Sequence, residues 1–336
     1  MERNRFYPKS FIPVLVIFLV LFVLGVVASV VFGARSLSLQ EVVDGLRNQG
    51  GAYESSVVHK RIIRTVFGLC CGAALGIAGV LMQSVTRNPL ADPSILGVNN
   101  GAAFFVVCGM AFFHINTASQ YIWFALSGAL FTAVFVFGIG SLGRGGAAPL
   151  KLVLAGAATS AALSSLVTAV MIPRTYVMDQ FRFWQVGSIG AGTRDSLLLL
   201  LPFLLVGVLV AVITAPALNA LALGDEMATG LGVKTGALRL VAAFTGVILC
   251  GATTAVAGPI GFVGLLATHL IRMLLGPDLR YLIPMSGLSG AVILIVSDVA
   301  GRLAGRPGEL EVGVLTAFLG APVLIILAMK AKVRSL

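Results

Sequence analysis

The sequence is poor in charge. Of its 336 residues only 11% are Asp, Glu, Lys or Arg, whereas a soluble globular protein carries roughly 25%. So few charges cannot cover the surface of a compact body of this size in water. The composition therefore excludes a soluble cytosolic enzyme and indicates an integral membrane protein. The long uncharged runs also exclude a transmembrane β-barrel, whose strands alternate apolar and polar residues.

Acidic residues, histidines and cysteines are also scarce. The chain has 13 Asp and Glu against 23 Lys and Arg, which gives a formal charge of +10. Most basic residues lie between apolar runs, where they orient a chain in the bilayer, so the charge does not indicate a nucleic-acid partner. Three scattered histidines do not supply the paired ligands of a haem enzyme. The four cysteines lie inside apolar runs, as small apolar side chains do, and we expect no cofactor or metal.

Uncharged runs locate the membrane spans, because one crossing takes about 20 helical residues. The 51-residue run 93–143 is long enough for two helices, and the run 240–271 is broken into two by Gly258-Pro259. The other runs hold one helix each. The ten predicted spans lie at 11–33, 65–86, 93–143 (two), 152–173, 196–224 (ending near Pro216), 240–271 (two), 281–297 and 312–329.

Ten spans place both termini on the same side of the membrane. With the termini inside, thirteen Lys and Arg lie on the inner side and ten on the outer side, which agrees in sign with the positive-inside rule. We predict one all-α polytopic transmembrane domain over 1–336, with short cytoplasmic tails at 1–10 and 331–336. The first run follows a basic start but is too long for the apolar region of a signal peptide, so we expect a retained helix.

The middles of the predicted spans contain no Asp, Glu, Lys or Arg. Ion-coupled carriers usually keep ionisable groups at depth, so this pattern argues against a secondary, ion-coupled transporter, which stays the alternative function. A phosphate-binding loop is also missing. Residues 230–235 only resemble one, because Val233 stands where the second glycine is required. We therefore do not expect this chain to hydrolyse ATP by itself.

Two features predict rigid structure at the inner side. The loop 87–93 contains Pro89 and Pro93, which make a stiff turn; it is either a plain connector or a rigid element at the inner mouth of a pore. Before it, Gly68, Gly72 and Gly76 recur every four residues. Such a ladder favours a helix-packing face over a pore lining.

The segment 217–235 follows Pro216 and contains Asp225 and Glu226 directly after Gly224, which is a favourable helix start. We expect two short helices here, lying along the inner membrane surface. An amphipathic lipid anchor is the other interpretation, but the acidic residues do not suit one. The segment is better explained as a docking element for a cytoplasmic partner.

Five segments occur in a characteristic order along residues 10 to 332: Arg61-Ile-Ile-Arg64, 72–97, 223–232, 256–272 and 315–322. They resemble the motifs of the FecCD-type permeases, which are the membrane subunits of ABC importers for ferric siderophores, haem and cobalamin. Three positions depart from the usual pattern: Ile63, Thr268 and Glu311.

The resemblance implies the fold and the partners. The fold is that of a type II ABC importer permease in the cytoplasmic membrane of a bacterium. The partners are a second permease chain (identical or paralogous), two cytoplasmic ABC ATPase subunits and an extracytoplasmic substrate-binding protein. The substrate is a ferric chelate, most simply a ferric siderophore.

The resemblance also implies roles for particular residues. Arg61, Arg64 and Arg302 would bind acidic groups of the binding protein, because guanidinium pairs well with carboxylates; anchoring to lipid headgroups is the alternative. Asn88 and Leu90 would form the cytoplasmic gate. Gln83, Trp184 and Gln185 are candidates for the substrate path, although packing explains Gln83 equally well. The ATPase-coupling residues would be Leu223, Gly224, Asp225, Glu226, Ala228, Gly230, Leu231 and Gly232.

Overall fold

The computed structural model describes residues 10–33, 38–47, 51–142 and 149–331. These residues form helices joined by loops, with no β-strand among them. Ten helices correspond to the predicted spans: α1 (Phe11–Val31), α3 (Ala52–Thr86), α4 (Val98–Phe112), α5 (Ala118–Gly140), α6 (Pro149–Met171), α8 (Arg194–Ala222), α10 (Thr235–Ala257), α11 (Val263–Leu275), α12 (Leu279–Ala304) and α13 (Val312–Ala331).

Seven of these helices are long and apolar enough to cross a membrane, and α4, α11 and part of α13 are shorter apolar helices. The prediction of an all-α polytopic protein with about ten spans is confirmed. Between the spans lie three short helices and a 3-10 turn: α2 (Leu39–Leu46), α7 (Thr175–Gln185), α9 (Asp225–Gly230) and η1 (Pro93–Leu96).

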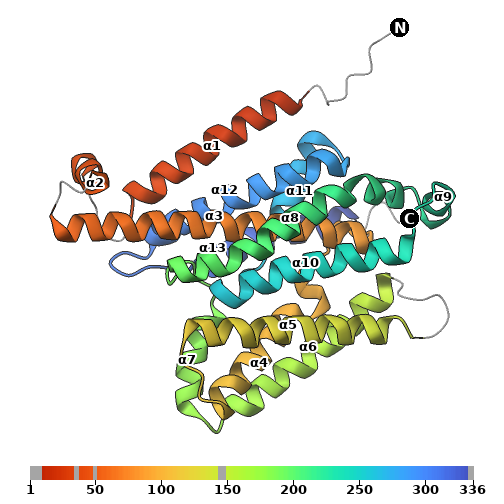
Figure 1. Cartoon of the computed structure of the whole chain (residues 1–336), viewed down its shortest axis with the longest axis horizontal. Coiled ribbons are helices and arrows are strands. Elements are labelled where there is room, and N and C mark those ends of the chain that lie inside the picture. Colours follow the sequence, from red (N-terminus) through yellow and green to blue (C-terminus); the bar gives the residue numbers. More distant parts are fainter. Residues whose placement is uncertain (1–9, 34–37, 48–50, 143–148, 332–336) are drawn as a thin grey trace.

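The helices run roughly along one axis of the molecule (Figure 1). The start of α1, the end of α13 and the short helix α9 lie at one end of this axis, and we call it the inner end. The helices α2 and α7 lie at the opposite, outer end. The first and last described residues, Ser10 and Ala331, therefore lie at the same end, as the even number of spans requires. The predicted tails at 1–10 and 331–336 otherwise lie outside the described residues.

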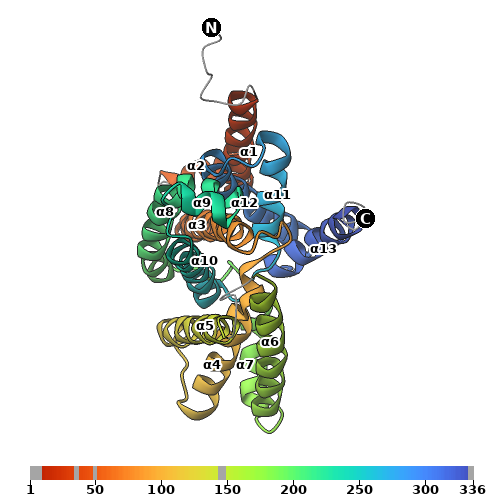
Figure 2. The same cartoon turned by 90° about the vertical axis from the view of Figure 1, so that its right-hand side faces the viewer.

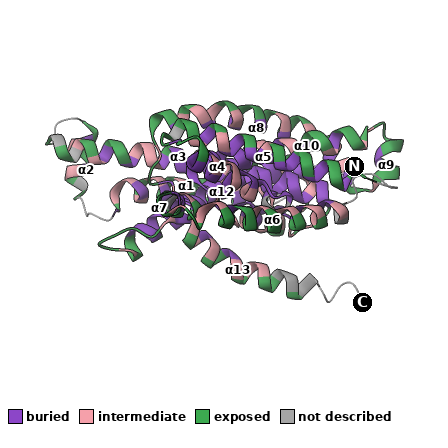
Figure 3. Ribbon diagram, turned by 90° about the horizontal axis from the view of Figure 1, so that it is seen from below, coloured by how far each residue is buried: buried purple, intermediate pink, exposed green. Residues whose placement is uncertain are grey.

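Three helices form the centre of the bundle. The apolar spans of α3 and α12 are each 78% buried and that of α10 is 72% buried, whereas α1, α6 and α8 expose most of their apolar surface. Figure 2 shows α3 and α12 surrounded by the other helices, with α4 to α7 grouped on one side. Buried residues accordingly concentrate along the middle of the bundle in Figure 3. The exposed apolar faces are those that a lipid bilayer would cover.

Small residues set the distance between the central helices. A methyl group added at Gly72 would collide with the backbone of Gly290, and one added at Gly76 would collide with the carbonyl of Ser286. Both partners belong to α12. The glycine ladder on α3 therefore packs against a neighbouring backbone, as predicted, because only glycine lets two helices approach so closely.

The predicted break at Gly258-Pro259 is present, but it divides the run unequally. The helix α10 has 23 residues and reaches Ala257, whereas α11 has only 13 residues, or about 20 Å. Gly258 and Phe262 have left-handed backbone conformations, with φ of 72° and 68°. The carbonyl of Ala257 accepts a hydrogen bond from the amide of Ser188 at 2.7 Å, so a neighbouring loop satisfies part of the backbone at the break.

Three helix ends differ from the sequence prediction. The helix α3 begins at Ala52 and not near 65, and α12 continues beyond 297 to Ala304. The helix α8 passes through Pro216 and ends at Ala222. Its last turns are held by Leu218 and Leu221, which are almost fully buried, because tertiary packing outweighs the local cost of proline. Only one short helix, α9, therefore forms in the segment 217–235, and the expected pair was wrong.

Candidate functional sites at the two ends of the bundle

The outer site is built around a buried carboxylate, Asp298 of α12. Its Oδ1 lies 2.7 Å from Nη2 of Arg64 on α3, and its Oδ2 lies 2.9 Å from Nη2 of Arg302, one turn further along α12. Asp298 and Arg302 are each only 1% exposed. A carboxylate so deeply buried needs such partners, because an unpaired buried charge is strongly destabilising.

Two arginines of this site bind the carbonyl groups that α1 leaves free at its outer end. Arg61 Nη1 donates to the carbonyls of Val30 and Val31 at 3.0 and 2.8 Å. Arg302 Nη1 donates to those of Ser29 and Phe32, both at 2.9 Å. The last carbonyls of a helix lack partners within it and carry partial negative charge, so cations there are stabilising. Arg61 and Arg302 thus fix α1 to the central helices.

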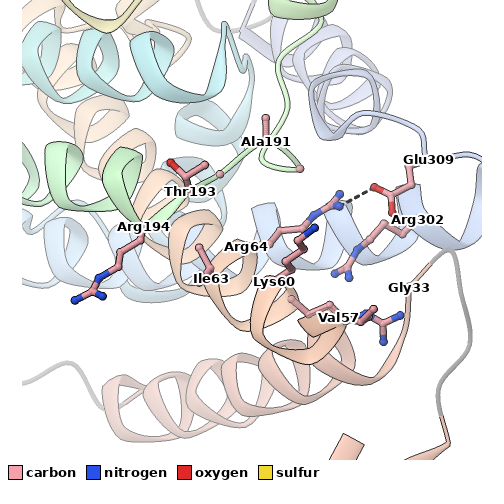
Figure 4. Close-up of a pocket in the computed structure, with 13 residues that line it drawn as sticks. Gly33, Val57, Lys60, Ile63, Arg64, Ala191, Thr193, Arg194, Arg302 and Glu309 are labelled. Atoms are coloured by element: carbon pink, nitrogen blue, oxygen red, sulfur yellow. Dashed lines mark hydrogen bonds and ion pairs between the residues drawn. The ribbon is translucent and has the colours of Figure 1, made fainter. Parts of the chain in front are cut away.

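The same residues border a cavity of about 590 Å³ at the outer end (Figure 4). Arg64 Nη1 reaches the cavity and bonds Glu309 Oε2 at 2.6 Å. In Figure 4, Arg194 lies at one end of the cavity, and Arg302 and Glu309 lie at the other. The cavity is rich in positive charge, since its lining includes the cations Lys60, Arg61, Arg64, Arg194 and Arg302, and the acidic residue Glu309.

The structure brings together the three arginines expected to dock a partner, but it gives them different exposures. Arg302 is buried and its guanidinium is bound within the chain. Arg61 and Arg64 are mostly buried, and both line the open cavity. Sequence reasoning missed Lys60 and Glu309. Lys60 could have been found because it directly precedes Arg61, whereas nothing local in the sequence connects Glu309 to Arg64.

A second cavity, of about 290 Å³, also lies at the outer end. Trp184 lines it together with polar side chains of Gln180, Ser188 and Ser196. The indole Nε1 of Trp184 is buried and has no hydrogen-bond partner among the residues that the structure describes. Gln185, the neighbour that was predicted with Trp184, is exposed and does not line this cavity.

At the inner end, Asp225 joins three helices. Arg87, which ends α3 in a left-handed conformation with φ of 50°, forms an ion pair with Asp225 and donates to the carbonyl of Leu221 at 2.8 Å. Arg239 of α10 bonds the same Oδ1 of Asp225 at 2.8 Å. The first residue of α9 is therefore bound to the end of α3 and to the start of α10.

The short helix α9 presents apolar side chains at the inner end. Leu223, Met227 and Leu231 are all exposed, whereas Ala228 is fully buried. Gly224 and Gly232 flank the helix with φ of 116° and 81°, in the region that favours glycine. Glu226 is exposed, and Gly230 has open space around its Cα. A short exposed helix with apolar side chains on it and directly beside it, between two glycines, is suited to insertion into a groove of another protein.

The loop 87–93 is a rigid turn. The side-chain Oδ1 of Asn88 accepts a hydrogen bond from the amide of Leu90 at 2.9 Å, and its carbonyl accepts one from the amide of Ala91 at 3.0 Å. Such Asx turns fix the backbone locally. Asn88 and Leu90 are half-buried at the inner end, and Gln83 is buried one turn earlier on α3. Within the described ranges, no group of three or more His, Cys, Asp or Glu residues could hold a metal ion.

Comparison with known proteins places the chain in a family. The sequence pattern of the FecCD transport family matches residues 20–330. A probable siderophore transport system permease protein of Bacillus subtilis, YfiZ, is 38% identical over 318 residues, which are 94% of this chain and 96% of the relative. The ferric enterobactin transport system permease protein FepD of Escherichia coli is 40% identical over 314 residues, 93% of each chain.

A solved structure agrees with these relatives. It shows an inward-facing conformation of a metal-chelate type ABC transporter, with a TM-score of 0.83 and 28% sequence identity. The similarity covers 95% of this chain and 99% of that chain. The likeness therefore extends over nearly the whole chain.

Proposed function

The chain belongs to the FecCD transport family, and we propose that it carries a ferric siderophore or a related iron chelate into a bacterial cell as the membrane-spanning subunit of an ABC importer. It is a multi-pass protein of the cytoplasmic membrane. One observation carries the proposal: the family match spans 20–330, and relatives that match over nearly their whole length are siderophore permeases.

We propose that ATP is hydrolysed on separate subunits and that α9 receives their movement. The exposed Leu223, Met227 and Leu231 supply the apolar contact. Asp225 transmits displacement of α9 to α3 and α10, because it is bound to Arg87 and Arg239. Asn88 and Leu90 follow Arg87 directly, so movement of the end of α3 would shift the proposed cytoplasmic gate.

At the outer end, the charged cavity is suited to acidic side chains of a substrate-binding protein. Lys60 and Arg194 are exposed there, and Arg61 and Arg64 line the same cavity. The guanidinium group binds carboxylates through two parallel hydrogen bonds. Arg302 supports the site from beneath, because it positions Asp298 and the end of α1. Glu309 would exchange its bond to Arg64 for one to the incoming carboxylate.

The path of the chelate is proposed to begin at the second outer cavity, where Trp184 presents an unpaired indole N–H. The exposed Gln185 would contact the chelate or the binding protein at the entrance. Gln83 would lie near the exit at the inner end. We further propose that two permease chains, identical or paralogous, enclose the path between them, with two ATPase subunits below and one binding protein above.

The test is reconstitution. The permease, its ATPase and its binding protein are placed in vesicles, and uptake is measured with a panel of ferric chelates. We expect uptake of at least one ferric siderophore that requires ATP and the binding protein, and that continues when an ionophore collapses the proton gradient. Uptake that is driven by an ion gradient without the ATPase would contradict the proposal and support the secondary transporter.

A further inference from the structure

A third cavity, of about 270 Å³, lies at the inner end between the end of α3, the last turns of α8 and the junction of α11 with α12. Gln83 and Arg87, which were given roles in the substrate path and in coupling above, line this cavity, but neither role assigns a ligand to the cavity itself. Its polar lining comes from Gln83, Ser84, Arg87 and Arg272. Its apolar lining includes Leu218 and Leu279.

The buried side-chain amide of Gln83 is the first indication that this cavity binds a ligand. It is only 3% exposed, and neither its Nε2 nor its Oε1 has a hydrogen-bond partner within the described part of the chain. Buried polar groups are nearly always hydrogen-bonded, because an unpaired one costs the full free energy of its desolvation. An amide that lines a cavity, with both of its polar atoms unpaired, is therefore explained most simply by a ligand in that cavity.

Arg272 is the second sign. It lies near the end of α11, is half-buried and makes no ion pair or hydrogen bond with the residues that the structure describes. Arg87 adds a second guanidinium, although its Nη2 is already bound to Asp225 and Leu221.

The lining residues include no carboxylate to neutralise these cations. Asp278, which lies between the lining residues Pro277 and Leu279, accepts hydrogen bonds from Asn219 Nδ2 at 2.7 Å and from the amide of Arg280 at 3.0 Å. The cavity thus offers the guanidinium of Arg272 and an amide donor with no acidic residue in the lining, and a second guanidinium, Arg87, whose charge is shared with Asp225. This is the chemistry of an anion site.

We infer that this cavity binds a phosphate group. Arginine is suited to phosphate because its planar fork donates two parallel hydrogen bonds. The phosphate can belong to an anionic phospholipid of the inner leaflet or to a free phosphate ion. The lipid fits the surroundings better, because the cavity lies at the inner end of the helices and has apolar walls beside its cations. Basic pockets between helices on the cytoplasmic side bind anionic lipid headgroups elsewhere.

The experiment uses the full chain in nanodiscs of phosphatidylcholine, alone or mixed with phosphatidylglycerol. Thermal unfolding and native mass spectrometry measure stabilisation and the number of bound phosphatidylglycerol molecules. Inorganic phosphate, added to the phosphatidylcholine discs, tests the free ion. Two variants remove the proposed ligands separately, Arg272→Gln and Gln83→Leu. The matched control is Arg280→Gln, since Arg280 is an exposed arginine nearby that does not line the cavity.

We expect phosphatidylglycerol to raise the unfolding temperature of the wild type, and Arg272→Gln to weaken its binding about tenfold, the usual loss for one charged hydrogen bond. Gln83→Leu should fold well, because it removes an unpaired amide, and should also reduce binding. A shift with inorganic phosphate alone would identify the free ion as the ligand. No shift with either ligand, or an equal loss in Arg280→Gln, would overturn the inference.

Discussion

Arg64 and Asp298 lie 234 positions apart in the sequence and form a two-pronged ion pair across α3 and α12. Nη2 of Arg64 lies 2.7 Å from Oδ1, and its Nε lies 3.2 Å from both carboxylate oxygens. Arg302 binds the other side of the same carboxylate at 2.9 Å. One acidic residue therefore holds two cations at the outer end, and one of these cations also binds the end of α1.

Asp298→Asn should destabilise the protein strongly. The substitution leaves Arg302 buried without a carboxylate, and breaking a buried pair costs about 3–5 kcal/mol. Unfolding by a denaturing detergent, followed by tryptophan fluorescence, measures the loss. Asp179→Asn is the matched control, because its pair with Arg182 is 60% and 63% exposed and should contribute less than about 1 kcal/mol. Equal effects of the two substitutions would show that the outer cluster does not stabilise the fold.

Asp225→Asn should uncouple ATP hydrolysis from uptake while leaving stability nearly unchanged. Asp225 is 47% exposed and Arg87 37%, and ion pairs as exposed as theirs contribute little to folding, although Arg239 is only 18% exposed. The substitution removes the charge that joins α9 to α3 and α10. Uptake per ATP hydrolysed, measured in vesicles with the partner subunits, should fall several-fold. Asp179→Asn removes an exposed carboxylate far from α9, on α7, and should leave this ratio unchanged. An unchanged ratio in Asp225→Asn would remove Asp225 from the proposed coupling path.

The two glycines that flank α9 should differ from the one within it. A valine at Gly224 or Gly232 must adopt a left-handed backbone that costs about 1–3 kcal/mol, so it should displace α9 and lower uptake. Gly230 has an ordinary helical backbone and open space around it. Gly230→Ala should therefore be tolerated, and it serves as the control in the same uptake and ATPase assays. Full uptake in Gly224→Val and Gly232→Val would contradict a role for the glycines as hinges.

Gly76→Ala should destabilise the bundle, because its methyl group would enter the space of the Ser286 carbonyl on α12. The two central helices would have to separate, and overpacking of this kind costs about 1–3 kcal/mol. Gly138→Ala on α5 is the control. It has no neighbour within 4 Å, so alanine should be neutral or slightly stabilising there. Thermal unfolding in one detergent compares the two, and similar unfolding temperatures would argue against close packing at Gly76.

The sequence predicted the positions of the membrane spans better than the residues at which the helices end. Uncharged runs locate the spans, because the bilayer core excludes unpaired charges. The run that ends at Ser297 did not end its helix, since Asp298 and Arg302 neutralise each other one turn apart and α12 continues to Ala304. Hydropathy also missed the outer part of α3, because residues 52–64 are polar enough to stand outside the membrane.

The sites were less predictable than the fold. Arg61, Arg64 and Arg302 were grouped by family resemblance alone, because no local pattern relates the α3 pair to a residue about 240 positions later. Arg61 and Arg302 are more buried than Arg64 because their guanidinium groups bind carbonyl groups of α1. The unpaired amide of Gln83 depends on which side chains surround it, so composition and spacing give no signal for it.

The helix α3 connects the two ends of the molecule. Arg61 near its outer end and Arg87 at its inner end are separated by about 39 Å of uninterrupted helix, and no proline lies between them. The middle of α3 packs closely against α12 at Gly72 and Gly76, so this contact lies between the two ends of the helix. If α3 moves as a rigid rod about this contact, a displacement beside Arg61 would move Arg87 in the opposite direction.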